Sequence, residues 1–318
     1  MRILLTGLGS IGRRHARLLR EHDCSFEIIA YRHDPSDIGN SMNIEVYTDL
    51  TEALETSPDV AFVTNPTHLH VNTALQCARY NCHLFIEKPI SNTLDGVNEL
   101  IEEVTKRDLV TQIGCQLRFD PVLNHVKDLI EGNELGEPLS FQVYSGSYLP
   151  DWRPNQDYRE SYSADPQQGG GVVLDLIHEI DYVRWLFGPT STVKSEISHV
   201  VSLNIDSEAI AEILVRVRSG VVGNVHLSYC RIQPRRTVEV VCEEGVVTGD
   251  LKNKEVITET KSAREVQTYE YGRDTRFRNQ LDYFIEHVQT NSQCENDLKE
   301  GKEVLKTALN VREGNSNE

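Results

Sequence analysis

The chain contains 318 residues, which is long enough for two domains that each bury a hydrophobic core. Hydrophobic residues make up 39% of it and charged residues 25%, as in an ordinary globular protein. The formal net charge of −17 disfavours binding to nucleic acid, because a phosphate-binding surface needs an excess of Lys and Arg on one face. No apolar run approaches the length that spans a bilayer, so we expect no membrane partner.

The cysteines and the first residues bear on the cellular compartment. The 7 cysteines are odd in number and show no C-x-x-C spacing, which predicts reduced thiols rather than disulfides or a zinc site. The first expected strand begins at residue 1 and leaves no room for a signal peptide. Both observations indicate a cytoplasmic protein.

A glycine-rich turn follows the first apolar run, residues 1–6. Gly7, Gly9 and Gly12 have the spacing of the dinucleotide-binding fingerprint, and the apolar residues within 13–20 suit a helix packed on a sheet. In this fingerprint the first glycine allows a tight turn, the second lets the backbone approach a pyrophosphate, and the third lets the helix pack closely on the strand. The N-terminus of the helix then offers N–H groups and positive dipole charge to the phosphates. The alternative is an ordinary strand–turn–helix corner.

Residues up to about 120 alternate between apolar runs and helical patterns. We expect strands at 26–31, 59–64, 83–87 and 109–114, and helices at 69–80 and 94–106. Such repetition with short loops implies parallel strand pairing and right-handed crossovers. The pattern therefore predicts a doubly wound parallel sheet over residues 1–120.

The pattern changes after residue 120. We expect a strand at 138–148, a polar and aromatic loop at 149–168, a helix at 172–187, strands from 193 to 259 with breaks at Ser219-Gly220, Gly245 and Gly249, and closing helices at 276–289 and 297–311. These elements predict a second α/β domain over 121–312 with an open, mostly antiparallel sheet. One face of that sheet would pack on a helix and the other would be free to meet a second subunit. The closing helices are able to pack back on the first domain, and a disordered tail is expected at 313–318.

A lysine stands at the end of one predicted parallel strand. Lys88 precedes Pro89, which favours an extended conformation for Lys88 and ends the strand. Parallel sheets bind ligands at the edge formed by the carboxyl ends of their strands, so Lys88 is a candidate active-site residue. The alternative is a solvated lysine.

A glycine triplet, residues 169–171, precedes a helix that carries Asp175, His178 and Asp181 at positions i, i+3 and i+6. Neighbouring pairs with this spacing share a helix face. An imidazole beside a carboxylate is oriented, has a raised pKa, and titrates near neutral pH, so it can exchange the hydroxyl proton of a substrate during hydride transfer. The alternatives are a charge pair at the helix N-terminus, a packed structural histidine, and a metal site, for which no other ligand cluster is visible.

These motifs together resemble the glucose–fructose oxidoreductase / inositol dehydrogenase / MocA family of nicotinamide-dependent oxidoreductases over nearly the whole chain. The resemblance is carried by residues 7–15, 63–70, 87–89 and 114–119 and by the helix after the glycine triplet. It implies an N-terminal Rossmann domain, a C-terminal α/β domain, and a hydride-transfer site between them. It also implies a homodimer or homotetramer that forms through the open C-terminal sheet.

The resemblance assigns roles to individual residues. Lys88 is the motif lysine that contacts substrate and cofactor, His178 is the proton donor and acceptor, and Asp175 is its helper or a ligand of a substrate hydroxyl. The implied cofactor-binding residues are Gly7, Gly9, Ser10, Ile11, Gly12, Arg13, Thr64, Asn65, Pro66, His70, Glu87 and Lys88. In the common family pattern three residues separate the Asp and the His, whereas two separate them here. The shorter spacing leaves open in which direction the Asp175 side chain points.

The residue after the second predicted strand bears on the choice of cofactor. In an NAD site, an acidic residue about twenty positions beyond the glycines binds the ribose hydroxyls. Arg32 occupies that place, and a guanidinium pairs with a 2′-phosphate that a carboxylate would repel. Ser10, Arg13 and Arg14 add donors and positive charge. We therefore expect NADP, while Asp34 keeps NAD open.

The loop before the helix at 172–187 is rich in Tyr, Trp, Arg and Asp. Aromatic faces with interspersed charges suit a polyhydroxylated ring, which stacks on its apolar face and forms hydrogen bonds at its edge. The predicted substrate-binding residues are Arg118, Trp152, Arg153, Tyr158, Arg159, Asp175 and His178. The three arginines are alternatively partners for a carboxylate or a sugar phosphate, and the loop is alternatively a dimer contact.

The sequence therefore predicts an NAD(P)-dependent dehydrogenase or reductase that acts on a secondary alcohol or ketone of a sugar, sugar nucleotide or cyclitol. Branches of the family with a similar loop and helix are associated with surface-saccharide pathways, which makes such a role an expectation here. One alternative is an NAD-dependent glycoside hydrolase on the same scaffold. Another is a non-catalytic sensor of the cofactor, against which the presence of both Lys88 and His178 counts.

Overall fold

A computed structural model describes residues 1–33 and 42–314, which form two compact units. The N-terminal unit contains Met1–Cys115 and Phe277–Leu305, and the C-terminal unit contains Gln116–Arg276 and the residues from Lys306 onward. The sequence places the boundary near residue 120 and assigns the closing helices to the second domain. In the structure the chain leaves the N-terminal unit after Cys115 and returns to it between Phe277 and Leu305.

The N-terminal unit is built on a six-stranded sheet of parallel neighbours, in the order β3-β2-β1-β4-β5-β6 among its described residues. The strands are β1 (Arg2–Leu5), β2 (Glu27–Tyr31), β3 (Glu45–Tyr47), β4 (Val60–Val63), β5 (His83–Ile86) and β6 (Thr111–Ile113). The strand order reverses direction between β1 and β4, which is the topological switch point of a doubly wound sheet. The predicted fold of this unit is confirmed.

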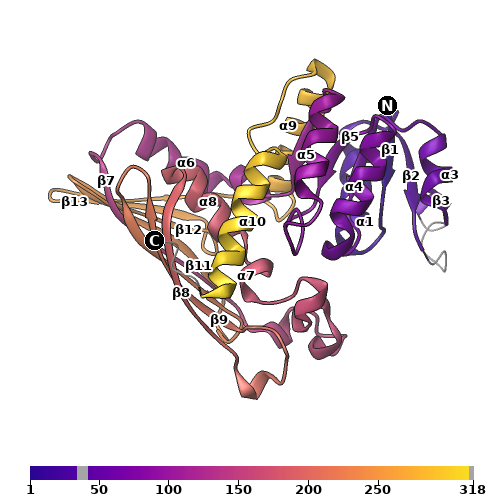
Figure 1. Cartoon of the computed structure of the whole chain (residues 1–318). Coiled ribbons are helices and arrows are strands. Elements are labelled where there is room, and N and C mark those ends of the chain that lie inside the picture. Colours follow the sequence, from indigo (N-terminus) through magenta and orange to yellow (C-terminus); the bar gives the residue numbers. More distant parts are fainter. Residues whose placement is uncertain (34–41, 315–318) are drawn as a thin grey trace. The chain divides into compact units, whose positions relative to one another are not determined.

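Helices cover both faces of this sheet (Figure 1). They are α1 (Ser10–His22), α3 (Leu50–Glu55), α4 (His70–Arg79), α5 (Val97–Lys106) and α9 (Thr275–Thr290). Phe62 and Phe85 face α1 and α9 in one hydrophobic core and stack with ring centroids 4.7 Å apart. Burying each of these rings stabilises the fold by about 1.5–3 kcal/mol. On the opposite face α4 contacts β4 and β5, and α5 packs beside α4.

The C-terminal unit is built on an eight-stranded sheet in the order β14-β13-β12-β11-β7-β10-β9-β8. The strands are β7 (Pro138–Gly146), β8 (Thr190–Ser198), β9 (Ile210–Val217), β10 (Val222–Ser228), β11 (Arg235–Cys242), β12 (Gly245–Asp250), β13 (Glu255–Thr260) and β14 (Arg264–Thr268). Only β7 and β10 pair in parallel; the other described neighbours are antiparallel. The predicted open, mostly antiparallel sheet is confirmed.

One face of this sheet is buried under helices and the other is open. The burial of β9 alternates, with Ala211, Ile213 and Val215 buried and Leu214 half exposed at 52%. Figure 1 shows α6 (Pro121–Glu131) and α8 (His178–Phe187) on the covered side. The end of α10 (Leu298–Glu313) lies on the same side, because Ser195 Oγ donates to the Val311 carbonyl at 2.7 Å.

One predicted break in the strands is wrong. The break expected at Gly245 is present, because β11 ends at Cys242 and β12 begins at Gly245, but Gly249 lies inside β12 and pairs with β11 and β13. A Cβ on Gly249 would come within 2.9 Å of the Val126 side chain of α6. The glycine is therefore needed where helix and strand approach closely, and it does not interrupt the strand.

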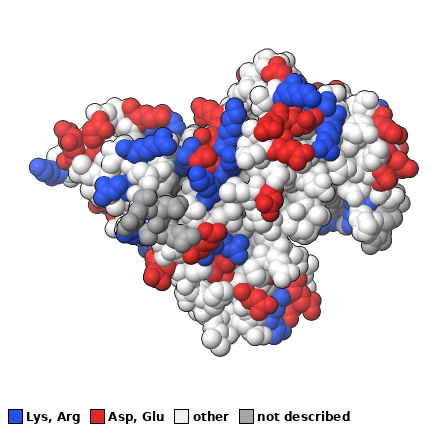
Figure 2. All heavy atoms as spheres, viewed as in Figure 1, with Lys and Arg blue, Asp and Glu red and all other residues white. Residues whose placement is uncertain are grey.

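The charges on the surface are mixed. The face shown in Figure 2 carries acidic and basic side chains interspersed with each other, without a wide area of one sign. Among the described residues no helix is long and apolar enough to span a membrane, and none of the 7 cysteines forms a disulfide. Of the predicted tail, Glu313 ends α10, and residues 315–318 lie outside the described residues.

Candidate active site

The glycine loop of the N-terminal unit is packed against the end of β4. A Cβ on Gly7 would lie 2.9 Å from the Thr64 carbonyl oxygen, and one on Gly12 would lie 1.9 Å from the Gly7 carbonyl oxygen. The Thr64 hydroxyl donates to that same Gly7 carbonyl at 2.9 Å. These two glycines are therefore required by close approach of the backbone, as the fingerprint predicts.

The start of α1 has the features of a phosphate-binding site. Gly9 caps the helix without a side-chain hydrogen bond, and a Cβ on Gly9 would meet nothing within 4 Å. The first N–H groups of a helix have no partner inside it, so α1 itself does not satisfy those of Ser10, Ile11 and Gly12. The first turn contains no acidic residue that would repel a phosphate. The loop therefore fits the pyrophosphate of a dinucleotide.

Asn65 and His70 connect the ends of β4 and β5. His70 is buried, and its two ring nitrogens lie 2.9 Å from the Pro89 and Asn65 carbonyl oxygens. Burial lowers the pKa of His70, although the two carbonyl groups act in the opposite direction. Asn65 donates to Thr73 Oγ1 at 2.8 Å, while its Oδ1 atom is buried without a hydrogen-bond partner among the described residues. An N–H or hydroxyl group of a bound ligand would satisfy that oxygen.

Lys88 lies two residues after the end of β5 and is partly exposed, with a cis peptide bond to Pro89. Its neighbour Glu87 turns inward, where Oε1 lies 2.7 Å from Nε2 of His15 in α1. Oε2 of Glu87 accepts the main-chain N–H of Lys88 at 3.3 Å. The Glu87 carboxylate is thus bonded within the N-terminal unit.

Arg32 lies immediately after β2, and its main-chain N–H donates to the Tyr47 carbonyl of β3 at 2.9 Å. It therefore occupies the strand end where an acidic residue binds ribose in an NAD site. Asp34, which the sequence left as an argument for NAD, lies outside the described residues.

The helix predicted at 172–187 is two helices. α7 (Val172–Asp175) ends at Asp175, Leu176 and Ile177 follow, and α8 begins at His178. The expectation that Asp175 and His178 share one helix face is therefore wrong. Both side chains are nevertheless buried, with Asp175 6% and His178 4% exposed.

Asp175 bonds to tyrosines that are distant in the sequence. The Tyr229 hydroxyl donates to Oδ2 of Asp175 at 2.6 Å. Burial and then the Asp175 charge raise the pKa of Tyr229. The Asp175 charge, burial and a hydrogen bond to Asp175 raise the pKa of Tyr162. Both phenols therefore stay protonated and act as donors to the carboxylate.

Two predicted substrate residues lie on this tyrosine pair. Trp152 meets the edge of Tyr229 with ring centroids 5.3 Å apart, and its Nε1–H donates to Ser147 Oγ at 2.8 Å. The Arg153 guanidinium lies over the Tyr162 ring at 5.1 Å. We call these five residues, Trp152, Arg153, Tyr162, Asp175 and Tyr229, the aromatic–carboxylate cluster. It combines apolar rings with a buried acceptor, as recognition of a polyhydroxylated molecule requires.

The other predicted substrate residues make different contacts. Arg118 binds Asp181 through two hydrogen bonds, of 2.9 and 2.7 Å, and both side chains are buried. The Tyr158 hydroxyl donates to the Leu203 carbonyl at 3.0 Å. Arg159 is exposed and binds Asp157, whose pKa it lowers to about 2 through side-chain and main-chain hydrogen bonds.

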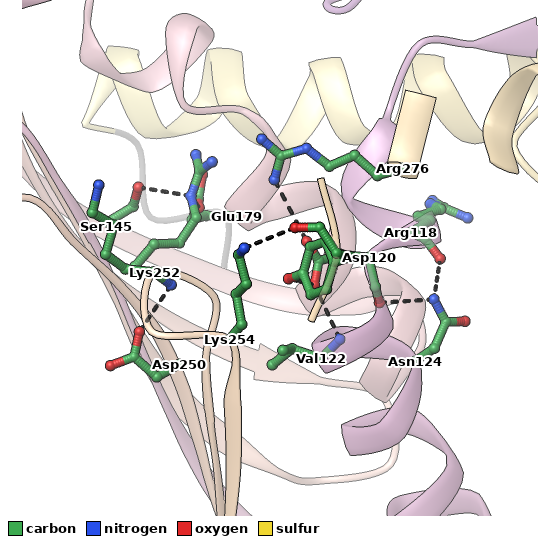
Figure 3. A network of polar contacts seen from close by, with 12 residues as sticks. Arg118, Asp120, Val122, Asn124, Ser145, Glu179, Asp250, Lys252, Lys254 and Arg276 are labelled. Carbon is green, nitrogen blue, oxygen red and sulfur yellow. Dashed lines mark hydrogen bonds and ion pairs between the residues drawn. The ribbon is translucent and has the colours of Figure 1, made fainter. Parts of the chain in front are cut away.

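Buried ion pairs anchor α8. Besides Asp181, Glu179 is fully buried and lies 2.7 Å from Nε of Arg236 on β11. Figure 3 shows Glu179 and a second set of groups around the buried Asp120 carboxylate, which accepts from Val122 N at 3.0 Å and from the Tyr271 hydroxyl at 2.9 Å. The helix that begins with His178 is therefore held from β11 and from η2 (Gln116–Phe119).

Among the described residues no group of three His, Cys, Asp or Glu side chains is arranged to hold a metal ion. The geometry explains this for the Asp-x-x-His-x-x-Asp pattern. Asp175 turns to Tyr229 and Asp181 turns to Arg118, so the two carboxylates have different partners.

The sequence did not identify Tyr229, Tyr162 or the contact between His15 and Glu87. Tyr229 follows β10, 54 positions from Asp175, and has no motif around it. Tyr162 stands within the predicted aromatic loop, so its residue type gave a signal although its partner did not. His15 belongs to the motif that carries the family resemblance, but no local pattern relates it to Glu87.

Three features together define the class of this protein. They are a glycine loop at the switch point of a parallel sheet, a lysine near the end of another strand of that sheet, and a buried histidine in a second α/β unit. They are the parts of a dinucleotide-dependent oxidoreductase. The profile of the oxidoreductase family with an NAD-binding Rossmann fold matches residues 1–115, and the GFO/IDH/MocA C-terminal domain matches residues 123–248. The chain belongs to the GFO/IDH/MocA family and is an NAD(P)-dependent oxidoreductase.

The similarity to known proteins covers nearly the whole chain. The myo-inositol 2-dehydrogenase of Thermotoga maritima is 27% identical over 321 residues, which cover 96% of this chain and 93% of that protein. The structure of levoglucosan dehydrogenase in complex with NADH and levoglucosan has a TM-score of 0.88 at 17% identity, covering 99% of this chain and 96% of the other. UDP-N-acetylglucosamine 3-dehydrogenase from Acidithiobacillus ferrooxidans has a TM-score of 0.82 at 19% identity, covering 99% and 97%.

Proposed function

We propose that this protein transfers a hydride between NAD(P) and a secondary alcohol or ketone carbon of a sugar, sugar nucleotide or cyclitol. The observation that carries the proposal is the aromatic–carboxylate cluster, which offers ring faces and a buried acceptor three residues before His178. The names of the similar proteins support it, because they specify a cyclitol, an anhydrosugar and a sugar nucleotide.

The N-terminal unit would hold the cofactor. The N–H groups of Ser10, Ile11 and Gly12 would bind the pyrophosphate, with Arg13 adding charge, while Thr64, Asn65, Pro66 and His70 line the adjoining strand end. A bound nicotinamide supplies a carbon that takes or gives a hydride. We infer a preference for NADP from Arg32, whose guanidinium suits a 2′-phosphate.

In the oxidation direction, the proton of the substrate hydroxyl passes to the imidazole of His178 as the carbon–oxygen double bond forms. The Lys88 ammonium binds that oxygen and stabilises the negative charge that develops on it. Asp175 accepts a hydrogen bond from a neighbouring substrate hydroxyl, with the tyrosines holding its carboxylate in place. The reverse direction uses the same groups, with His178 giving the proton back.

Substrate recognition is assigned to the residues that contact Asp175 or its tyrosines. Trp152 and Arg153 would contact the substrate ring. Arg118, Tyr158 and Arg159 are bonded to Asp181, Leu203 and Asp157, so we assign them to shaping the loop and α8. A role in surface-saccharide synthesis is part of the proposal, because family branches with a similar aromatic loop and helix are associated with such pathways.

The proposal is tested with purified protein, by fluorescence titration with NADPH and NADH and by a screen of sugars, sugar nucleotides and cyclitols for a change in nicotinamide absorbance. We expect one cofactor to bind tightly and at least one substrate of these classes to give turnover. Lys88→Ala and His178→Ala should each lower kcat by roughly 100-fold or more while cofactor binding and thermal unfolding stay near wild type. Full activity in either variant would remove that residue from the mechanism.

A further inference from the structure

A histidine and a glutamate form a buried pair directly behind Lys88. Nε2 of His15 lies 2.7 Å from Oε1 of Glu87, and the two side chains are 2% and 12% exposed. Because a carboxylate only accepts, the imidazole N–H is the donor. The second oxygen of Glu87 accepts the main-chain N–H of Lys88 at 3.3 Å. One carboxylate therefore bonds both to helix α1 and to the peptide that carries Lys88.

The environment of His15 fixes its ring. It packs against Phe85, Phe62 and Phe277 with centroid separations of 5.0, 5.3 and 6.4 Å. Contacts with three aromatic rings leave the imidazole little freedom, and in such an apolar site a hydrogen bond to a carboxylate is strong. The position of Glu87 is thus determined by α1, the helix whose N-terminus forms the phosphate site.

The opposite side of the carboxylate is kept clear by a glycine. A Cβ on Gly114, at the end of β6, would lie 3.0 Å from Oε2 and 3.1 Å from Cδ of Glu87. Any larger residue at 114 would displace the carboxylate by a few tenths of an ångström. His15 and Gly114 therefore define the position of Glu87 from two directions.

Stability alone does not account for such a pair. An apolar residue would suit the ring-lined site, and replacing a buried polar pair by apolar groups is often neutral or stabilising. The pair instead fixes the position of the Lys88 main chain, since it connects α1 to the end of β5 that carries Lys88. We propose that His15 is a positioning residue for hydride transfer, which acts through Glu87 to set the main chain of Lys88.

The inference rests on the proposed role of Lys88, and the experiment separates the two. His15→Phe keeps an aromatic ring among the phenylalanines but removes the donor, whereas His15→Gln keeps an N–H donor. We expect His15→Phe to lower kcat by about 10- to 100-fold, the size of effect that misplacing a reacting group causes, with little change in substrate KM or NAD(P)H binding. His15→Gln should recover most of kcat, which a merely structural role would not predict.

A double-mutant cycle with Lys88→Ala tests the route of the effect. If His15 acts through Lys88, His15→Phe should cost no further activity once the Lys88 ammonium is gone. Phe284→Leu is the matched control, because Phe284 packs on Phe62 and Phe85 in the same core and should lower Tm without lowering kcat. Gly114→Ala reaches the same carboxylate from its other side and should lower kcat if His15→Phe fails to fold.

Each outcome decides one point. Full activity of Lys88→Ala would overturn the proposed role of Lys88, and the inference with it. If Lys88→Ala has a lowered kcat and adding His15→Phe lowers kcat again by the same factor as in the wild type, the inference about His15 alone is overturned. Equal activities of His15→Gln and His15→Phe, or a Gly114→Ala variant with wild-type kcat, would also overturn it.

Discussion

At the scale of single residues, the partner of Asp175 changes what that carboxylate can do. The sequence left open whether it assists His178 or binds a substrate hydroxyl, and in the structure it accepts the Tyr229 hydroxyl at 2.6 Å. A buried carboxylate costs free energy unless hydrogen bonds compensate its lost hydration, and the two protonated phenols supply them. Asp175 is thereby a fixed acceptor in the aromatic–carboxylate cluster, three residues before His178, the proposed proton-transfer group.

Tyr229→Phe is expected to weaken substrate binding and the fold together. Removing the donor leaves the Asp175 carboxylate short of one bond, a loss of about 1–3 kcal/mol. Steady-state kinetics should show a raised substrate KM, and thermal unfolding a lowered Tm. Tyr182→Phe is the control, because the buried Tyr182 hydroxyl has no hydrogen-bond partner among the described residues. A Tyr229→Phe variant that behaves like this control would contradict the role of the cluster.

Arg32→Asp is expected to reverse the preference between the two cofactors. A carboxylate after β2 repels the 2′-phosphate of NADP and accepts the ribose hydroxyls of NAD. The ratio of kcat/KM for NADP to that for NAD should fall by at least about 10-fold, equivalent to about 1.4 kcal/mol. Arg17→Asp, a change of the same charge on the exposed face of α1, should leave the ratio unchanged. An unaltered ratio in Arg32→Asp would show that Arg32 does not contact the phosphate.

At the scale of elements, the break after Asp175 places Asp175 and His178 in two different helices. α7 ends with Asp175 directed at Tyr229, and α8 begins with His178. α8 is then anchored by Asp181 to Arg118 and by Glu179 to Arg236. Such buried pairs are costly to break, so they hold the helix in one place and His178 with it.

Asp181→Asn is expected to destabilise the C-terminal unit strongly. The substitution leaves the Arg118 guanidinium buried without its counter-charge, which costs about 3–5 kcal/mol. Denaturant unfolding should show the loss directly. Glu99→Gln breaks the exposed pair with Arg79 and should cost less than about 1 kcal/mol. Equal losses in the free energy of unfolding would show that burial does not determine how much the Asp181–Arg118 pair contributes to stability.

At the scale of the whole molecule, the open face of the C-terminal sheet carries exposed apolar side chains. Leu214 of β9 is 52% exposed and Val266 of β14 is 48% exposed. The strand register places both on the outward face, in one row that runs through Ile257 and Asn224. We propose that a homodimer or homotetramer forms through this face.

Leu214→Glu is expected to weaken that assembly, because it replaces an exposed apolar side chain of this face with a charge that contact would desolvate. Light scattering coupled to size-exclusion chromatography should show a lower mass at a given concentration, with unchanged circular dichroism. Leu69→Glu, on an exposed leucine of the N-terminal unit, is the control. A wild-type monomer, or an unchanged mass in Leu214→Glu, would contradict the proposal.

Local sequence patterns predicted most elements but missed several. The expected strands at 26–31 and 83–87 agree with β2 and β5 to within one residue at each end. β3 has three residues and no apolar run, and β14 is exposed along its length, so neither has a periodic pattern to detect. α6 was missed although Asp120 and Pro121 form a helix start, with Asp120 accepting from Val122 N.

The sequence by itself determined the doubly wound unit, the glycine loop and the family, because their signals lie in the spacing of residues a few positions apart. Only the tertiary structure decided the partners of the buried polar groups. Asp175 meets Tyr229 across 54 positions, Arg118 meets Asp181 across 63, and His15 meets Glu87 across 72. No local pattern encodes such pairs, since they follow from how the sheets and helices pack. The candidate residues for proton transfer are therefore recognisable from sequence, while the partners that hold buried polar groups in place are visible only in the fold.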